Sequence, residues 1–171
     1  MNVCGKSEKD YVEVVERLSD QPVDLLEINV SCPNVKEGGI AFGQDPNALY
    51  KITKAVKAKA AQPIMMKLSP NVTDITEMAK AAVEGGSDAL SLINTLTAMK
   101  IDIEKRDFVL ANKTGGMSGP AIKPVAVRMV YQAANAVDVP IIGMGGIATA
   151  QDALEFIMAG ATEFLSGQQI L

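Results

Sequence analysis

The sequence predicts an α/β protein of consecutive strand–helix units, and three features indicate this fold class. Short, strand-like apolar runs alternate with longer segments of helical periodicity. The runs are almost continuously hydrophobic, as strands covered on both faces are. Polar residues and glycines follow them directly, at strand ends where barrel enzymes carry their chemistry. Together these features predict a parallel sheet with right-handed helical crossovers.

Each expected strand is a hydrophobic stretch that ends in a polar or glycine-rich turn. The strands are residues 25–31, 63–69, 89–95, 140–146 and 162–167. The helices between them have recognisable starts, because Ser or Asp precedes the apolar stripe or Pro occupies the first turn. These starts are Ser7 with Asp10, Asp45-Pro46, Asp74, Lys123-Pro124 and a point near Ala150.

Two segments depart from this alternation. Residues 98–121 are polar and contain a glycine cluster, so they are expected to form an excursion, such as a hairpin and a loop. Pro70 and Asn71 in MKLSPNVTDI are expected to make a turn without a functional role.

Two architectures fit repeated strand–helix units: an open doubly wound sheet, or part of a (β/α)8 TIM barrel. About five strands cannot close the usual eight-stranded barrel. The polar and glycine-rich positions nevertheless follow every one of the expected strands, which favours an incomplete barrel of the TIM-barrel class.

Composition restricts the function classes. The 171 residues, 48% hydrophobic and 21% charged, fit one globular domain, and a net charge of −4 argues against a nucleic-acid surface. No apolar run could cross a bilayer, and no signal-peptide pattern follows Met1. Cys4 and Cys32 form no CxxC, so a reducing cytoplasm is expected, without disulfides or a cysteine-bound cluster. The absence of histidine removes Ser-His-Asp triads and most zinc enzymes, and no metal site is predicted.

Glycines after two successive strands indicate a phosphate site. GMGG at 143–146 and Ser166-Gly167 would place backbone N–H groups side by side at adjacent strand ends. Alternatively, these glycines only make tight turns. Neither GxGxxG nor GxxxxGK[ST] occurs, so a dinucleotide fold and a P-loop have no support.

Polar side chains at other strand ends indicate a flat, polar ligand. Lys67 ends an apolar strand and would suit an anion or an electron-rich ring, although it could also reach solvent or form a Schiff base. Asn29, Asn34 and Asn94 could hold a ligand with carbonyl and N–H groups, although asparagine is also an ordinary turn residue.

Cys32 lies in a loop stiffened by proline. Its thiolate could act as a nucleophile or a base if it is partly exposed; otherwise it is a buried, inert side chain. Cys4, before the first helix, is expected to be inert.

Four segments carry a resemblance to a known family: EINVSCPNVKEGGIAFG, MMKLSPNVTDI, ANKTGGMSGPAIKPVAVRMVYQ and PIIGMGGIATAQDALEF. They resemble the dihydroorotate dehydrogenases, most closely the cytoplasmic, cysteine-using, NAD-linked branch. The resemblance extends from about Asn2 to Gly167. It implies a (β/α)8 barrel with FMN at the carboxyl ends of the strands, present here as a single FMN-binding domain over residues 1–171.

The resemblance also implies roles for individual residues. Cys32 in NVSCPN matches the catalytic base that takes a proton from C5 of dihydroorotate, while hydride leaves C6 for flavin N5. The other matched positions contact flavin or substrate in the family. Flavin contacts are implied for Asn2, Asn29, Lys67, Ile93, Gly119, Gly145, Gly146 and Gly167, and substrate contacts for Asn29, Asn34, Asn94 and Thr95.

The same branch implies partners. It oxidises dihydroorotate to orotate in UMP biosynthesis and passes electrons to a partner subunit that carries FAD and an iron–sulfur cluster. A homodimer within a heterotetramer is the implied assembly. Two alternatives stay open: the flavin domain of a dihydropyrimidine dehydrogenase, and a catalytically inactive fragment. A Schiff-base lyase that uses Lys67 is a more distant one.

Two departures from the family pattern matter. Family chains begin well before Met1, and FLSGQQIL stands where they have Gly-Thr and a further helix, so that Gln168 replaces a flavin-phosphate contact. The resemblance therefore implies that N-terminal βα units and C-terminal helices are missing. Because an open barrel exposes two strand edges and apolar faces, we expect the 171-residue chain to self-associate or fold poorly.

Overall fold

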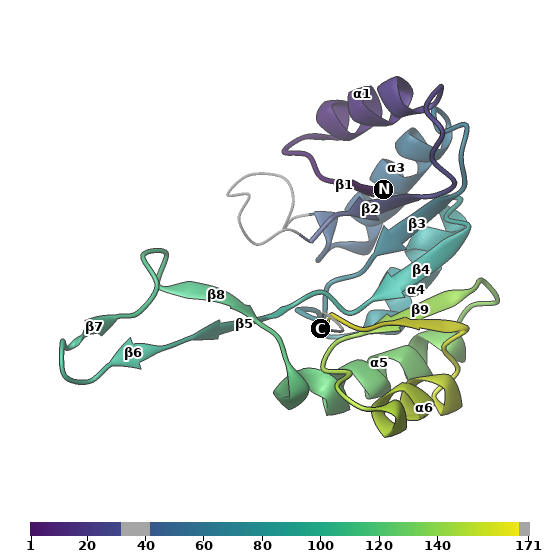
Figure 1. Ribbon diagram of the computed structural model, residues 1–171. Coiled ribbons are helices and arrows are strands. Elements are labelled where there is room, and N and C mark those ends of the chain that lie inside the picture. The colour runs from purple at the N-terminus through teal and green to yellow at the C-terminus, as the bar shows by residue number, and fades with distance from the viewer. Residues whose placement is uncertain (32–41, 168–171) are drawn as a thin grey trace.

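The computed structural model describes residues 1–31 and 42–167, and its centre is a six-stranded parallel sheet (Figure 1). Strands adjacent in the sheet follow one another in chain order, from β1 at one edge to β10 at the other. The strands are β1 (Asn2–Val3), β2 (Leu26–Asn29), β3 (Ile64–Lys67), β4 (Ala89–Leu92), β9 (Ile141–Met144) and β10 (Glu163–Leu165).

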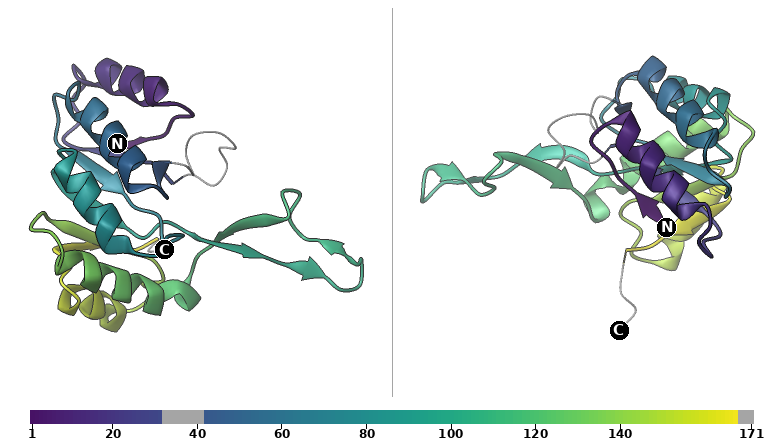
Figure 2. Two further views of the ribbon diagram at one scale, coloured as in Figure 1. Left: turned by 180° about the vertical axis from the view of Figure 1, so that it is seen from behind. Right: turned by 90° about the horizontal axis from the view of Figure 1, so that it is seen from above.

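The helices form one layer against this sheet. They are α1 (Glu8–Leu18), α3 (Pro46–Lys57), α4 (Ile75–Glu84), α5 (Lys123–Ala134) and α6 (Ala150–Met158), with a short 3-10 helix, η1 (Pro120–Ile122), before α5. Each helix contacts the next one in this series, as expected for helices on a single face (Figure 2). A doubly wound sheet would reverse its strand order and place helices on both faces. The structure is therefore part of a barrel, as the sequence predicts.

Four of the five predicted helix starts are confirmed by side-chain caps, and α5 begins at Lys123, as predicted, without one. The Ser7 hydroxyl accepts a hydrogen bond from the Asp10 amide in a full capping box, and Asp45 and Asp74 accept from amides of their first turns. The helix expected near Ala150 also has a capping box, formed by Thr149 and Asp152.

The prediction of about five strands is one too few. β1 contains only Asn2 and Val3, which pair in parallel with Glu27 and Ile28 of β2. Two residues cannot carry a recognisable apolar run, so no sequence pattern marks this strand. Pairing with β2 and the burial of Val3, which is 2% exposed, stabilise it.

The two faces of the sheet differ in chemistry. Leu26 and Ile28 of β2 belong to the hydrophobic core that packs against the helices. Glu27 and Asn29 alternate with them and therefore face the other side, which is the interior side of a barrel. Strand register places Lys67 of β3 beside Asn29, on that same side.

Residues 96–117 form an arm that projects from the body (Figures 1 and 2). β5 (Leu96–Met99) pairs antiparallel with β8 (Thr114–Met117), and β6 (Ile101–Asp102) pairs with β7 (Asp107–Phe108). This arm is the excursion predicted for residues 98–121. None of the helices in residues 1–31 and 42–167 has the length and apolar character needed to cross a bilayer.

Candidate functional site

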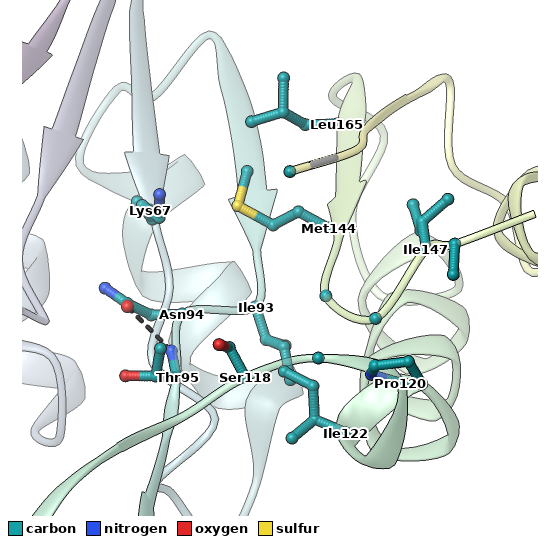
Figure 3. A pocket seen from close by; sticks show the side chains of 15 residues that line it. Lys67, Ile93, Asn94, Thr95, Ser118, Pro120, Ile122, Met144, Ile147 and Leu165 are labelled. Carbon is teal, nitrogen blue, oxygen red and sulfur yellow. Dashed lines mark hydrogen bonds between the residues drawn. The ribbon is translucent and has the colours of Figure 1, made fainter. Parts of the chain in front are cut away.

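A cavity of about 430 Å³ lies at the carboxyl ends of β3, β4, β9 and β10 (Figure 3). This volume is within the range of small-molecule sites. Lys67, Asn94, Thr95 and Ser118 supply polar groups along one part of the wall, and aliphatic side chains with glycine backbone form the rest. The lining residues are Lys67, Ile93, Asn94, Thr95, Ser118, Gly119, Pro120, Ile122, Met144, Gly145, Gly146, Ile147, Ala148, Leu165 and Gly167.

The glycine loop after β9 requires glycine for two reasons. Gly145 and Gly146 have φ values of 121° and 78°, which L side chains rarely adopt. A Cβ on Gly146 would also lie 2.7 Å from the carbonyl oxygen of Gly119. These two glycine segments can therefore pack together only without side chains.

Gly119 and Gly167 are not crowded, because a Cβ added to either would have no heavy atom within 4 Å, although Gly119 also has a positive φ, of 89°. Both line the cavity, so open space adjoins their backbones there. Two glycines that border a cavity without being crowded leave room for a ligand to approach the main chain closely.

Backbone bonds hold the end of β4 at the cavity wall. The Ile93 amide donates to the Met144 carbonyl at 3.0 Å, and the Asn94 amide donates to the Leu68 carbonyl at 3.0 Å. The peptide bond between Leu92 and Ile93 is cis. Ile93 and Asn94 are thus fixed between the ends of β3 and β9.

The Asn94 side chain is the centre of a polar network. Its amide nitrogen donates to Asn29 Oδ1 at 3.0 Å and to Ser31 Oγ at 2.6 Å, and its oxygen accepts from the Thr95 amide at 2.8 Å (Figure 3). Because both ends of the amide have protein partners, its orientation is set before any ligand binds. The network joins the end of β2 to the end of β4.

Lys67 is paired with a carboxylate that sequence reasoning missed. Its Nζ lies 3.6 Å from Glu27 Oε2, and both side chains are largely buried. The Glu27 carboxylate also accepts hydrogen bonds from the Asn2 amide group and from the buried Ser91 hydroxyl. The alternation in Leu26-Glu27-Ile28-Asn29 could have placed Glu27 on the interior side of the barrel.

A second ion pair supports the glycine loop from behind. Lys123 Nζ donates to Asp152 Oδ1 at 2.6 Å and to Glu155 Oε1 at 2.7 Å. These two carboxylates, Asp152 first, raise the pKa of Lys123. The Lys123 hydrogen bond and then the Ala148 amide hold the pKa of Asp152 well below its usual range. Lys123 packs next to Gly146, so this pair fixes α5 and α6 on either side of the loop.

Most residues implied by the resemblance meet at this cavity. Asn29 and Asn2 are not part of its lining: Asn29 bonds to Asn94, which lines the cavity, and Asn2 bonds to Glu27, the partner of Lys67. Cys32, Asn34 and Gln168 lie outside the described residues. The eight that line the cavity are Lys67, Ile93, Asn94, Thr95, Gly119, Gly145, Gly146 and Gly167.

Asn71 has a structural role beyond the expected turn. Its side-chain nitrogen donates to the Thr95 carbonyl at 3.0 Å, and its oxygen accepts from the Thr97 amide at 2.9 Å. It therefore anchors the base of the arm beside the cavity. Asn71 was missed because its partners are distant in sequence.

The residues present fit a planar ligand that carries a phosphate, as FMN does. The aliphatic part of the wall suits a ring system, Lys67 and the asparagines suit its polar edge, and the uncrowded glycines suit a phosphate. In residues 1–31 and 42–167 there is no group of three or more His, Cys, Asp or Glu side chains that could hold a metal ion.

Fold and site together define an α/β-barrel protein with a small-molecule site at the carboxyl ends of its strands. The chain belongs to the dihydroorotate dehydrogenase family, whose model matches residues 1–169. It is 75% identical over 162 residues to the dihydroorotate dehydrogenase B (NAD(+)) catalytic subunit of Lachnoclostridium phytofermentans, covering 95% of this chain and 54% of the relative. The catalytic subunit of the same name from Alkaliphilus metalliredigens is 65% identical, with the same coverage. The chain thus spans about half the length of the curated relatives it matches.

Proposed function

We propose that this chain serves the oxidation of dihydroorotate to orotate with FMN, in de novo pyrimidine biosynthesis. One observation carries the proposal: eight residues that the family resemblance assigns to flavin or substrate line a single cavity, although they come from separate segments of the chain. The names of the similar catalytic subunits support the same activity.

In this proposal the cavity binds the flavin. Ile93, Gly145 and Gly146 form the wall beside the ring, and Lys67 adjoins the polar edge of the ring. Gly119 and Gly167 leave the main chain accessible where a phosphate can approach. When bound, FMN supplies the acceptor for the hydride that leaves C6 of dihydroorotate.

The chain's own polar residues orient the substrate. Dihydroorotate presents carbonyl and N–H groups and a carboxylate, and an amide can pair with either kind of group. The two N–H donors of Asn94 are already bonded to Asn29 and Ser31, so its oxygen, which keeps one lone pair, is suited to accept a hydrogen bond from a substrate N–H, with Thr95 beside it. Asn34 is proposed to contribute from the loop after β2.

Cys32 is proposed as the base that takes the proton from C5. That proton is acidified by the neighbouring carbonyl, so a thiolate is a sufficient base without histidine. Departure of the C5 proton to Cys32 and of the hydride from C6 leaves the C5–C6 double bond of orotate.

The proposed assembly and location follow from the NAD-linked branch. Electrons would pass to a partner subunit with FAD and an iron–sulfur cluster, because two cysteines in this chain cannot ligate such a cluster. A homodimer within a heterotetramer, in the cytoplasm, is the corresponding arrangement. A single FMN-binding domain over residues 1–171 is also part of the proposal.

The visible absorption spectrum after incubation with FMN and gel filtration tests the proposal. It is measured on the 171-residue chain and on a chimera in which residues 1–167 replace the matching part of the Lachnoclostridium phytofermentans catalytic subunit. We expect a retained flavin spectrum that dihydroorotate bleaches. A colourless chimera would contradict the proposal, whereas a colourless 171-residue chain beside a yellow chimera would identify the shorter chain as the inactive form.

Cys32→Ser tests the proposed base. In the chimera we expect bleaching by dihydroorotate to slow by at least about 100-fold, as expected for loss of a general base. Cys4→Ser is the matched control, and its bleaching rate should equal that of the parent. Undiminished bleaching in Cys32→Ser would remove the base assignment and leave flavin binding untouched.

A further inference from the structure

Glu27 is the one carboxylate in the described part of the chain that pairs with Lys67. It lies on the interior side of β2, one strand away from Lys67 on β3, and its side chain is 15% exposed against 18% for Lys67. Two opposite charges this shielded from water interact more strongly than a surface pair does. The pair therefore contributes to the electrostatic potential inside the cavity that Lys67 lines.

The two partners are held very differently. Glu27 has neighbours on both sides: the Asn2 side chain donates to its Oε2, and the buried Ser91 hydroxyl donates to its Oε1 at 2.8 Å. Lys67 has no other side-chain partner among residues 1–31 and 42–167. The Glu27 carboxylate is thus held in place by its other partners, whereas the orientation of the Lys67 ammonium is set mainly by Glu27.

The separation of the pair is also informative. A direct charge-assisted N–H···O bond is about 2.7–2.9 Å long, and Lys67 Nζ is 3.6 Å from Glu27 Oε2. Glu27 attracts the ammonium without fully engaging its three N–H donors. Those donors stay available to a ligand in the cavity.

We propose that Glu27 is a positioning residue for Lys67: it holds the ammonium at the cavity wall and offsets its charge, and so sets the potential that a bound flavin meets. The flavin part of this inference rests on the proposed function. The Glu27–Lys67 pairing itself does not.

The direction of the effect follows from the charges. A two-electron-reduced flavin carries more negative charge than an oxidised one, so an uncompensated ammonium favours the reduced form and a nearby carboxylate opposes it. Removal of the Glu27 charge should therefore raise the midpoint potential. We expect about a tenfold shift of the oxidised–reduced equilibrium, which is about 30 mV for a two-electron couple.

Three variants of the FMN-loaded chimera and chain test this by dye-equilibrated reduction. Glu27→Gln should raise the midpoint potential of the flavin. Glu27→Asp keeps the charge, so its midpoint potential should lie close to that of the parent. Glu84→Gln, an equal charge change on the exposed end of α4, should leave the potential at the parent value. An unshifted potential in Glu27→Gln, or equal shifts in Glu27→Gln and Glu84→Gln, would overturn the positioning role.

A double-mutant cycle in flavin-free protein tests the pairing separately. Glu27→Gln and Lys67→Met should each lower the urea midpoint, and the double variant should lose less than the sum. Additive losses would overturn the pair even if FMN binds. A chimera that retains no flavin would refute the proposed function, and this cycle would still decide whether Glu27 and Lys67 act together.

Discussion

Gly146 and Gly167 line the same cavity, but the space around their backbones differs. At Gly146, the φ of 78° and the 2.7 Å that would separate an added Cβ from the Gly119 carbonyl oxygen both exclude a side chain. Gly167 has no heavy atom near its own Cβ position. The two glycines look equivalent in the sequence, and the structure shows that Gly146 is crowded whereas Gly167 borders open space.

Alanine at these two glycines should therefore have different effects. Gly146→Ala should lower the free energy of unfolding by about 1–3 kcal/mol, the usual range for a strained backbone conformation. Gly167→Ala should leave stability unchanged and weaken FMN binding, because its methyl group enters the open space. Urea unfolding and flavin-fluorescence titration measure the two effects. A stable Gly146→Ala protein would show that the loop relaxes without cost.

At the scale of elements, the ion pair between α5 and α6 predicts a pH dependence. The pKa of Asp152 is held low by Lys123, so its stabilisation is fully present above the unfolded pKa of about 4 and is lost as the pH falls through the folded pKa. Asp152→Asn should melt at a lower temperature than the parent at pH 7. The difference should shrink below about pH 4. Asp20→Asn, at an exposed turn, is the control. If the difference in melting temperature between the parent and Asp152→Asn stayed undiminished as the pH falls toward the folded pKa, the role of the Asp152 charge would be contradicted.

At alkaline pH the same ion pair loses its stabilising contribution as the pH rises, which is the opposite direction to the acidic side. The pKa of Lys123 is raised by Asp152 and Glu155, so its contribution is complete below the unfolded pKa of about 10.4 and is lost as the pH rises through the folded pKa. The advantage of the parent over Asp152→Asn should therefore also narrow above about pH 10.5, in the same melting series.

The arm is an element whose outer part lies apart from the core. Met99 and Thr114 form the last pair of the β5–β8 ribbon, so an Asn-Gly turn can join them in place of residues 100–113. Because no residue of 100–113 belongs to the hydrophobic core cluster, this deletion should leave the thermal midpoint within about 2 °C of the parent. A large drop in the midpoint would show that the outer arm supports the body.

At the scale of the whole molecule, β1 and β10 are the edges of the sheet, and no other strand in residues 1–31 and 42–167 pairs with their outer sides. Phe164 of β10 pairs with Gly143, whose own Cβ position faces Phe156 of α6, so Phe164 points to the helix side of the sheet. It is nevertheless 45% exposed. An apolar side chain on an unpaired strand edge favours association between chains.

The 171-residue chain should consequently self-associate in sedimentation velocity experiments. Phe164→Glu should shift the distribution toward monomer, because it places a charge on the open edge. Leu154→Glu, at an exposed position of α6, should have a smaller effect. A monodisperse monomer that melts cooperatively would show the prediction to be wrong.

The sequence by itself determined the βα order, the helix starts and most of the cavity residues. These features depend on local patterns: apolar runs, caps one turn long, and motifs such as GMGG that lie together in the chain. The family resemblance added roles to residues that the patterns had only located.

The tertiary structure decided what depends on partners distant in sequence. β1 exists because Asn2 and Val3 pair with β2, Asn71 matters because it holds the base of the arm, and Glu27 matters because Lys67 is on the next strand. No local pattern records such pairings, since their free energy arises only when the strands come side by side. For this protein, the sequence predicts which residues belong to the site, and the fold determines which of them contact one another.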